Sequence, residues 1–327
     1  MVGVRMSLPT PESAMSGRRA RAPLGILLKV LSVTLFVTMF ACIKAVGDAV
    51  PLGEKVFFRS LFALPPILLW VSVRGGFPEQ LKTANPWGHL RRGLAGVSAM
   101  SLGFLAIGLL PFPEVVAIGY AAPLFATLLA AALLGERLRV YRLSAISLGL
   151  VGVLLVLSPR LGLVEAGEAA SRLEALGACA ALAAAVLSAF AQVFARGLVA
   201  TETTASVAFW FTITSSVCAL VTLPFGWVLP EPRDLLLLVV AGLLGGTGQI
   251  LLTESYRHAE LAVIAPFDYA SILLSLGIGW FVFGESPTVT MLAGAAIVVL
   301  AGLIILYRER RLGLERERVR AAAPTQG

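Results

Sequence analysis

The feature that most constrains this chain is a series of apolar runs, each long enough to cross a lipid bilayer. A helix needs about 20 mostly apolar residues to span the hydrocarbon core, where it satisfies its own backbone hydrogen bonds. Only 14% of the 327 residues are charged, whereas soluble domains average about 25%. The runs are continuous, unlike the alternating segments of about ten residues that a β-barrel requires. The sequence therefore predicts an all-α, polytopic membrane protein.

We predict ten transmembrane helices in two groups of five. A polar linker at 159–174 separates the groups. The expected organisation is a tail at 1–23, a first five-helix repeat at 24–158, a second at 175–307 and a basic tail at 308–327. The expected spans are 24–46, 56–73, 93–110, 115–134, 143–157, 175–195, 205–229, 235–255, 261–283 and 289–307.

The distribution of basic residues indicates the orientation. If the N-terminus is cytoplasmic, the two tails and the even-numbered loops hold 19 Lys and Arg, with Arg92 among them, and the odd-numbered loops hold 3. Cytoplasmic loops are enriched in Lys and Arg. The net charge of +7 is therefore a sign of topology and not of nucleic-acid binding. We expect a multi-pass protein of the cell inner (plasma) membrane with both termini in the cytoplasm.

An internal echo adds to this picture. The stretch around Tyr120 matches the stretch around Tyr269 at an offset of 149 residues, and the same offset places Gly135–Glu136 on Gly284–Glu285. Because each half has five spans, the second half begins on the opposite side of the membrane. Inverted repeats of this kind are typical of secondary transporters, which hold the substrate near the midplane. The echo therefore predicts a carrier with two inverted five-helix repeats around a central cavity.

Three motifs carry a family resemblance: GER at Gly135–Arg137, APFDY to FGE at Ala265–Glu285, and Tyr307–Glu309. With the two five-span halves, they resemble EamA-type members of the drug/metabolite transporter superfamily over about residues 24–309. The resemblance implies a ten-helix inner-membrane carrier of small metabolites, exporting or importing. It also implies a cavity lined by helices one, three, four, six, eight and nine, with helices five and ten peripheral and available for a homodimer.

Charged residues inside the predicted spans are the first candidates for a binding site. A carboxylate within a span is costly and functional by default, so Asp268 is a candidate for binding substrate or a coupling proton. Its alternative role is an ion pair that holds helices together. Arg59 can clamp a substrate carboxylate through its bidentate guanidinium, or extend to the membrane surface. For Lys29 and Lys44, near opposite ends of the first span, extension to the surface is the expected role.

Two prolines are expected to break helices at gating positions. Pro266 removes a backbone donor in span nine, and Pro123 is expected to act in the same way in span four. Tyr120 and Tyr269, which the repeat relates, can each present a ring and a hydroxyl to a substrate, or pack with the hydroxyl bonded to a neighbour. Proline kinks also occur in membrane helices without a function.

Further polar residues lie deep in the spans or at their ends. Ser98, Gln192 and Gln249 can bind a substrate or serve as hydrogen bonds between helices. Glu136 and Glu285 end their helices, where the dipole disfavours a carboxylate. We therefore expect a neighbouring arginine, or backbone amides of the next helix, to compensate them, and we interpret both as structural gates.

The leading hypothesis is a secondary transporter that moves a small organic metabolite, such as an amino acid or related zwitterion, by alternating access. No nucleotide-binding motif is present, so we expect no cofactor and a gradient, such as a proton gradient, as the energy source. The alternative is a membrane-embedded enzyme that acts on a lipid-linked substrate. Such an enzyme needs clustered carboxylates with a metal, or paired His and Asp, and the two histidines lie in different loops. A scaffold without transport would leave Asp268 and Arg59 unexplained.

Overall fold

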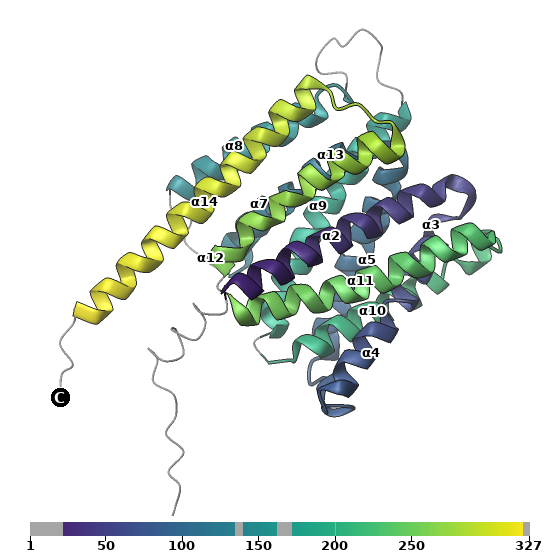
Figure 1. The fold of residues 1–327 in the computed structure, drawn as a ribbon, viewed down its shortest axis with the longest axis horizontal. Coiled ribbons are helices and arrows are strands. Elements are labelled where there is room, and N and C mark those ends of the chain that lie inside the picture. Colours follow the sequence, from purple (N-terminus) through teal and green to yellow (C-terminus); the bar gives the residue numbers. More distant parts are fainter. Residues whose placement is uncertain (1–21, 135–139, 162–171, 200, 260, 323–327) are drawn as a thin grey trace, which may run out of the picture.

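The computed structural model describes residues 22–134, 140–161, 172–199, 201–259 and 261–322. Within these ranges the chain forms α-helices and short 3-10 helices, and no strand occurs. Figure 1 shows long helices running side by side, with α8 (Val140–Leu157) and α14 (Val289–Ala322) paired along one flank.

Proline and glycine divide the helices of the first half. Helix two consists of α3 and α4, and the break between them lies just before Pro65 and Pro66, because proline is tolerated only in the first turn of a helix. Helix four is likewise made of α6 and α7. The bounds are α2 (Ala22–Val46), α3 (Leu52–Leu61), α4 (Leu64–Val73), α5 (Pro86–Leu109), α6 (Phe112–Gly119) and α7 (Ala121–Leu134).

The second half follows the same plan. Helix nine is made of α12, the 3-10 segment η4 and α13. The bounds are α9 (Arg172–Val199), α10 (Thr204–Leu220), α11 (Pro232–His258), α12 (Leu261–Ile264), η4 (Ala265–Tyr269) and α13 (Ala270–Phe283). In the described ranges, eight segments are long and apolar enough to cross a membrane, and two shorter apolar helices, Leu143–Leu157 and Thr204–Leu220, complete a set of ten.

The predicted all-helical membrane architecture is thus confirmed, with differences at several helix ends. Helix three begins at Pro86 rather than at residue 93, and helix seven ends at Leu220 rather than at residue 229. Helix two begins at Leu52 rather than at residue 56. Helix ten continues to Ala322 through the basic segment, because this segment is rich in Arg, Glu and Leu, which favour helix.

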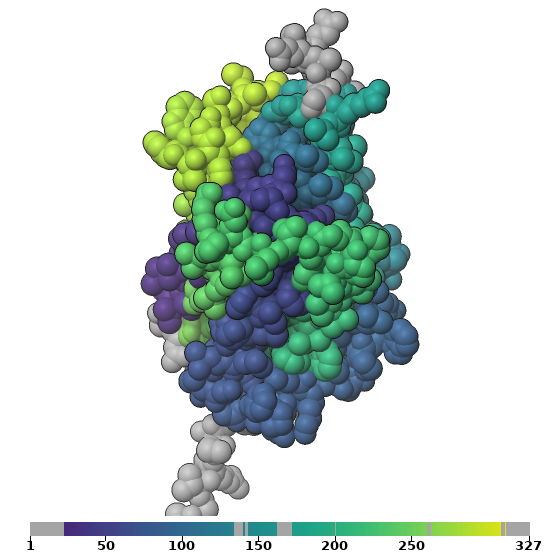
Figure 2. Space-filling view, turned by 90° about the vertical axis from the view of Figure 1, so that its right-hand side faces the viewer, coloured from purple at the N-terminus to yellow at the C-terminus, as the bar shows by residue number. Residues whose placement is uncertain are grey.

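The helices pack in a two-fold pattern. α2 lies along α11, and α5 lies along α9, so helix one meets helix eight as helix six meets helix three. Three other contacts join α8 to α14, α3 to α10 and α6 to α13. If the two halves are exchanged, the α2–α11 pair takes the place of the α9–α5 pair, and each of the other three pairs maps onto itself. Figure 2 shows the same mixing at the surface, where segments of the first half (purple and blue) and of the second half (green) share one face.

Glycines allow some of these helices to touch through their backbones. A Cβ added at Gly294 would lie 2.6 Å from the carbonyl oxygen of Gly152, and one added at Gly242 would lie 2.4 Å from the Cβ of Phe62. Small residues at such crossings are typical of membrane helix pairs. The α8–α14 and α11–α3/α4 contacts therefore depend on the absence of a side chain.

Glu202, between α9 and α10, ties two loops together. Its Oε1 accepts hydrogen bonds from the Thr83 hydroxyl at 2.8 Å and from the amides of Ala84 and Asn85 at 2.8 and 3.1 Å. Burial acts to raise the pKa of Glu202, but these hydrogen bonds and the nearby His89 together hold it below its ordinary value. The contact fixes the start of α5 beside the start of α10.

Candidate functional site

Helices four and nine are broken at positions that the repeat relates. α6 ends at Gly119 and α7 begins at Ala121, while η4 separates α12 from α13. Pro123 has no N–H to donate to the carbonyl of Gly119, and Pro266 lies within η4. The structure therefore has helix breaks at both predicted positions.

The two breaks bind each other through a pair of tyrosines. The rings of Tyr120 and Tyr269 are stacked, with centroids 4.9 Å apart and an interplanar angle of 24°. The Tyr120 hydroxyl donates to the backbone carbonyl of Asp268 and lies 2.7 Å from Ser271 Oγ. The two tyrosines that the internal repeat relates are therefore in direct contact, and they join helices four and nine.

Lys29 does not extend to the membrane surface, and that expectation was wrong. Its Nζ lies 2.6 Å from Asp268 Oδ1, and the two side chains are 3% and 41% exposed. The same ammonium lies 5.5 Å from the ring centroid of Tyr256. Because α2 packs against η4, the Lys29 ammonium contacts the Asp268 carboxylate instead of solvent. Asp268 therefore forms an ion pair between helices in this structure, which is the contact given above as its alternative.

Lys44 was also expected at the surface, and it too is paired inside. Its Nζ lies 2.7 Å from Glu285 Oε1 and donates to the carbonyls of Ile107 and Leu110 at 3.2 and 2.8 Å. Glu285 Oε2 accepts from the amide of Phe112, the first residue of α6, at 2.7 Å. The unfavourable position of Glu285 is thus compensated by a backbone amide, of helix four rather than of the next helix, and by a lysine rather than an arginine.

These ion pairs fasten helix one to helix nine at two depths. Lys29 and Lys44 are 15 residues apart on α2, which corresponds to about 22 Å along the helix axis. Between them lies an apolar seam that includes the buried Val33, Val37 and Phe112. The arrangement places one ion pair toward each side of the membrane, with a layer of buried apolar side chains between the two pairs.

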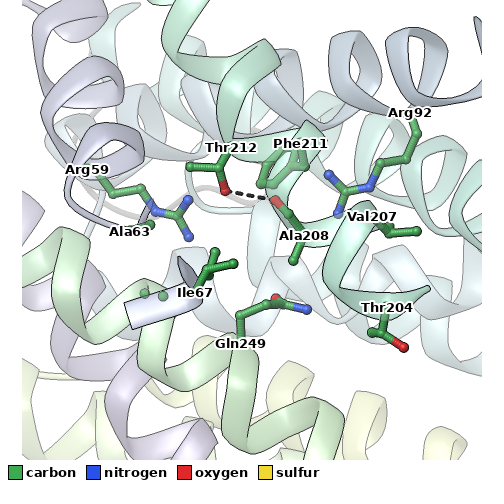
Figure 3. Close-up of a pocket in the computed structure, with 12 residues that line it drawn as sticks. Arg59, Ala63, Ile67, Arg92, Thr204, Val207, Ala208, Phe211, Thr212 and Gln249 are labelled. Carbon is green, nitrogen blue, oxygen red and sulfur yellow. Dashed lines mark hydrogen bonds between the residues drawn. The ribbon is translucent and has the colours of Figure 1, made fainter. Parts of the chain in front are cut away.

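A cavity of about 40 Å³ lies between helices two, three, seven and eight. Figure 3 shows Arg59 and Arg92 entering it from opposite sides, with the Gln249 side chain between them. Phe211, Thr212 and Thr204 also line it. α5 and α11 belong to the helices that the resemblance implied for the cavity, whereas α3, α4 and α10 do not.

The two guanidinium groups in this cavity have weak protein partners. Arg59 is 8% exposed, and its Nε donates only to the sulfur of Met39 at 3.5 Å. The Cζ of Arg92 lies 3.8 Å from the ring centroid of Phe211, and its Nε and Nη1 are buried without a hydrogen-bond partner. Within the described ranges, neither arginine has a carboxylate within 4.0 Å.

Other predicted residues lie elsewhere. Ser98 lines a second cavity of about 400 Å³ between helices two, three and seven. Gln192 is exposed on α9 and lines neither cavity. Glu136 falls outside the described residues. Glu254 on α11 is paired with Arg74 at 2.8 Å and with Arg257 at 3.6 Å.

Arg92 is the functional candidate that sequence reasoning missed, because it was counted among the cations of a cytoplasmic loop. A signal was available. The Asn85 side chain caps α5 by accepting from the amide of Gly88 at 2.9 Å, and Pro86 opens the helix. An Asn–Pro pair is a recognised helix start, and it places Arg92 nearly two turns inside α5.

Comparisons with known proteins agree with this architecture. The pseudopaline exporter CntI of Pseudomonas aeruginosa is 29% identical over 88% of this chain and 97% of its own length. The riboflavin transporter of Rhizobium johnstonii is 28% identical over 92% of this chain and 96% of its own. The S-adenosylmethionine uptake transporter of Rickettsia prowazekii is 27% identical over 82% and 87%.

A solved crystal structure of another protein, 23% identical, superposes with a TM-score of 0.62 and covers 89% of this chain and 99% of the other, which supports the fold. The sequence profile of the EamA-like transporter family matches residues 23–158 and again 175–307. The chain therefore belongs to the EamA-like transporter family of the drug/metabolite transporter superfamily, and it is a multi-pass membrane transporter of a small molecule rather than an enzyme.

Proposed function

We propose that the chain is a secondary carrier that moves a small organic metabolite across the cell inner membrane by alternating access. The observation that carries the proposal is the contact between the two broken helices, where Tyr120 and Tyr269 stack at repeat-related positions. Broken helices at the interface of inverted repeats are where such carriers bind and release substrate. The two-fold helix pairing also supports two repeats, at 24–158 and 175–307, that rock against each other.

In this mechanism the two ion pairs act as gates on opposite sides. With the N-terminus in the cytoplasm, the orientation that the basic residues favour, Lys29–Asp268 closes the inner side and Lys44–Glu285 closes the outer side. A state open to one side breaks one pair and keeps the other. Asp268, once released from Lys29, is the carboxylate available to take up a coupling proton.

A zwitterion would suit a cavity with Arg59 at one level and Asp268 at another. Asp268 contacts Lys29, whereas Arg59 lines the cavity between helices two, three, seven and eight. The named relatives handle three different compounds, so family membership does not select a substrate.

The gating mechanism can be tested without a known substrate. A single reporter cysteine, Gln249→Cys, is placed in a chain whose three native cysteines are replaced by alanine. A membrane-impermeant thiol reagent is then applied to either side of oriented vesicles. Asp268→Asn is expected to speed labelling from the inner side, and Glu285→Gln from the outer side.

The control is Lys82→Gln, since Lys82 belongs to an exposed pair with Glu79 (70% and 69% exposed). It is expected to leave both labelling rates unchanged. If Asp268→Asn and Glu285→Gln both speed labelling from the same side of the membrane, the two pairs are not opposed gates. Alternating access around them is then refuted.

A further inference from the structure

We propose that the cavity between Arg59 and Arg92 binds an anionic end group, a carboxylate or a phosphate, of a water-soluble metabolite. The identity of this anion as the transported substrate rests on the proposed carrier function. The binding of the anion itself rests only on the geometry of the cavity.

In the described part of the chain, Arg59 and Arg92 lack the oxygen partner that the other buried cations have, including Lys55, which donates to the carbonyl of Gly47. Lys29, Lys44 and Arg160 each lie within 2.9 Å of a carboxylate oxygen. Arg59 and Arg92, in the described part of the chain, have a thioether and an aromatic face instead. An ionised group that is buried without a counter-charge is costly. A bound anion would supply the missing partner.

The orientation of the polar groups around the cavity also favours an anion. Figure 3 shows both guanidiniums pointing into the cavity from opposite walls. The fully buried Nε and Nη1 of Arg92 are unpartnered donors, and a guanidinium binds carboxylate and phosphate with two parallel hydrogen bonds. Thr204, the first residue of the 17-residue helix α10, also lines the cavity, so the positive end of that helix faces the same space.

The volume limits what can enter. A water molecule needs roughly 10–15 Å³ of such space, so a cavity of about 40 Å³ has room for about three waters. A carboxylate or a phosphate headgroup fits, and a whole metabolite does not. The cavity therefore holds the charged end of a substrate whose remaining part lies outside it.

The charges limit the substrate class. Two cations line the cavity, and its lining includes no acidic residue. An ammonium group placed there would meet two like charges and no carboxylate. The geometry thus favours an organic dicarboxylate or a phosphate monoester, and it disfavours the charged amine of a simple zwitterion at this position.

The test measures the melting temperature of the purified full-length protein in lipid-free detergent. Succinate and inorganic phosphate serve as probes, with sodium chloride at matched ionic strength as the reference. A ligand that binds the folded state raises the melting temperature by mass action, so at least one probe is expected to raise it in a saturable manner. Arg59→Gln and Arg92→Gln are each expected to weaken the apparent affinity by about tenfold or more, because each removes charge-assisted hydrogen bonds.

Arg91→Gln is the matched control, since Arg91 neighbours Arg92 on α5 but is exposed. It is expected to keep the affinity of the wild-type protein. Gln249→Glu covers the case in which the arginine variants do not fold, since it places a carboxylate among the lining residues. This variant is expected to melt at a higher temperature without anion and to lose the anion-dependent shift.

The outcomes separate the anion site from the carrier function. No saturable shift with either probe, or an unchanged shift in Gln249→Glu, overturns the site. A shift produced by phosphatidylglycerol but by neither probe assigns the cavity to a lipid headgroup and overturns the substrate assignment. If the arginines bind the probes but wild-type vesicles accumulate neither succinate nor phosphate monoesters, the site stands and its link to transport fails.

Discussion

Breaking the Lys29–Asp268 ion pair should cost a different amount of stability depending on which partner is removed. Asp268→Asn leaves an ammonium group that is 3% exposed and has lost its counter-ion. Removing one partner of a buried pair costs about 3–5 kcal/mol, and an asparagine carbonyl still accepts one hydrogen bond, so we expect about 3 kcal/mol. Lys29→Met leaves a carboxylate that is 41% exposed and can be hydrated.

The methionine keeps most of the apolar packing of the lysine stem. Pairs that reach solvent contribute only about 0–1 kcal/mol, so Lys29→Met should cost about 1 kcal/mol. The predicted difference between the two variants is therefore about 2 kcal/mol. The unequal burial of the two partners is its cause.

The assay is reversible unfolding in mixed detergent micelles, followed by circular dichroism, for both single variants and for Lys29→Met combined with Asp268→Leu. The double variant should recover most of the loss, because no unpaired charge remains. Glu79→Gln serves as a control, since its exposed pair with Lys82 should contribute less than about 0.5 kcal/mol. The reasoning is refuted if Lys29→Met is as destabilising as Asp268→Asn.

Three further outcomes follow from the described contacts. The pKa of Glu202 is lowered in the folded state, so its stabilisation is complete above the unfolded value of about 4.3 and is lost as the pH falls through the folded value. Melting curves of Glu202→Gln should accordingly show a weaker loss of stability with acid than the wild type. Gly242→Ala should destabilise by about 1–3 kcal/mol through overpacking against Phe62, whereas Gly277→Ala, which meets nothing within 4 Å, should be neutral or stabilising in the same unfolding assay. Tyr120→Phe removes the hydroxyl that joins the two helix breaks, and hydrogen exchange at η4 should become faster while the melting temperature falls only slightly.

The helical architecture could be predicted because hydropathy acts on every residue of a span. Ten apolar runs and a repeated Gly–Glu pair are long-range patterns that do not depend on how side chains meet. The breaks at Pro123 and Pro266 were also local, since the missing N–H of proline acts on its own helix. For these features, residues that are neighbours in the sequence are enough to determine the structure.

The partners of the charged residues could not be predicted, because they depend on which helices become neighbours. Lys29 and Lys44 were expected to extend to the membrane surface, as a lysine near the end of an isolated span usually does. In the folded bundle, Asp268 and Glu285 lie within 2.7 Å of them instead. Nothing local to α2 indicates that helix nine lies beside it. Arg92 was missed for a different reason, since its position depends on where α5 begins.

The packing of helix one against the second half has a consequence for biosynthesis. Lys29 and Lys44 emerge from the ribosome about 240 residues before their counter-ions, Asp268 and Glu285. At roughly 5–20 residues per second, the first helix waits on the order of 10–50 seconds with two uncompensated ammonium groups. We expect the first helix to be retained at the lipid headgroups, or shielded by the insertion machinery, during this interval. Helix nine then neutralises a segment made about 240 residues earlier.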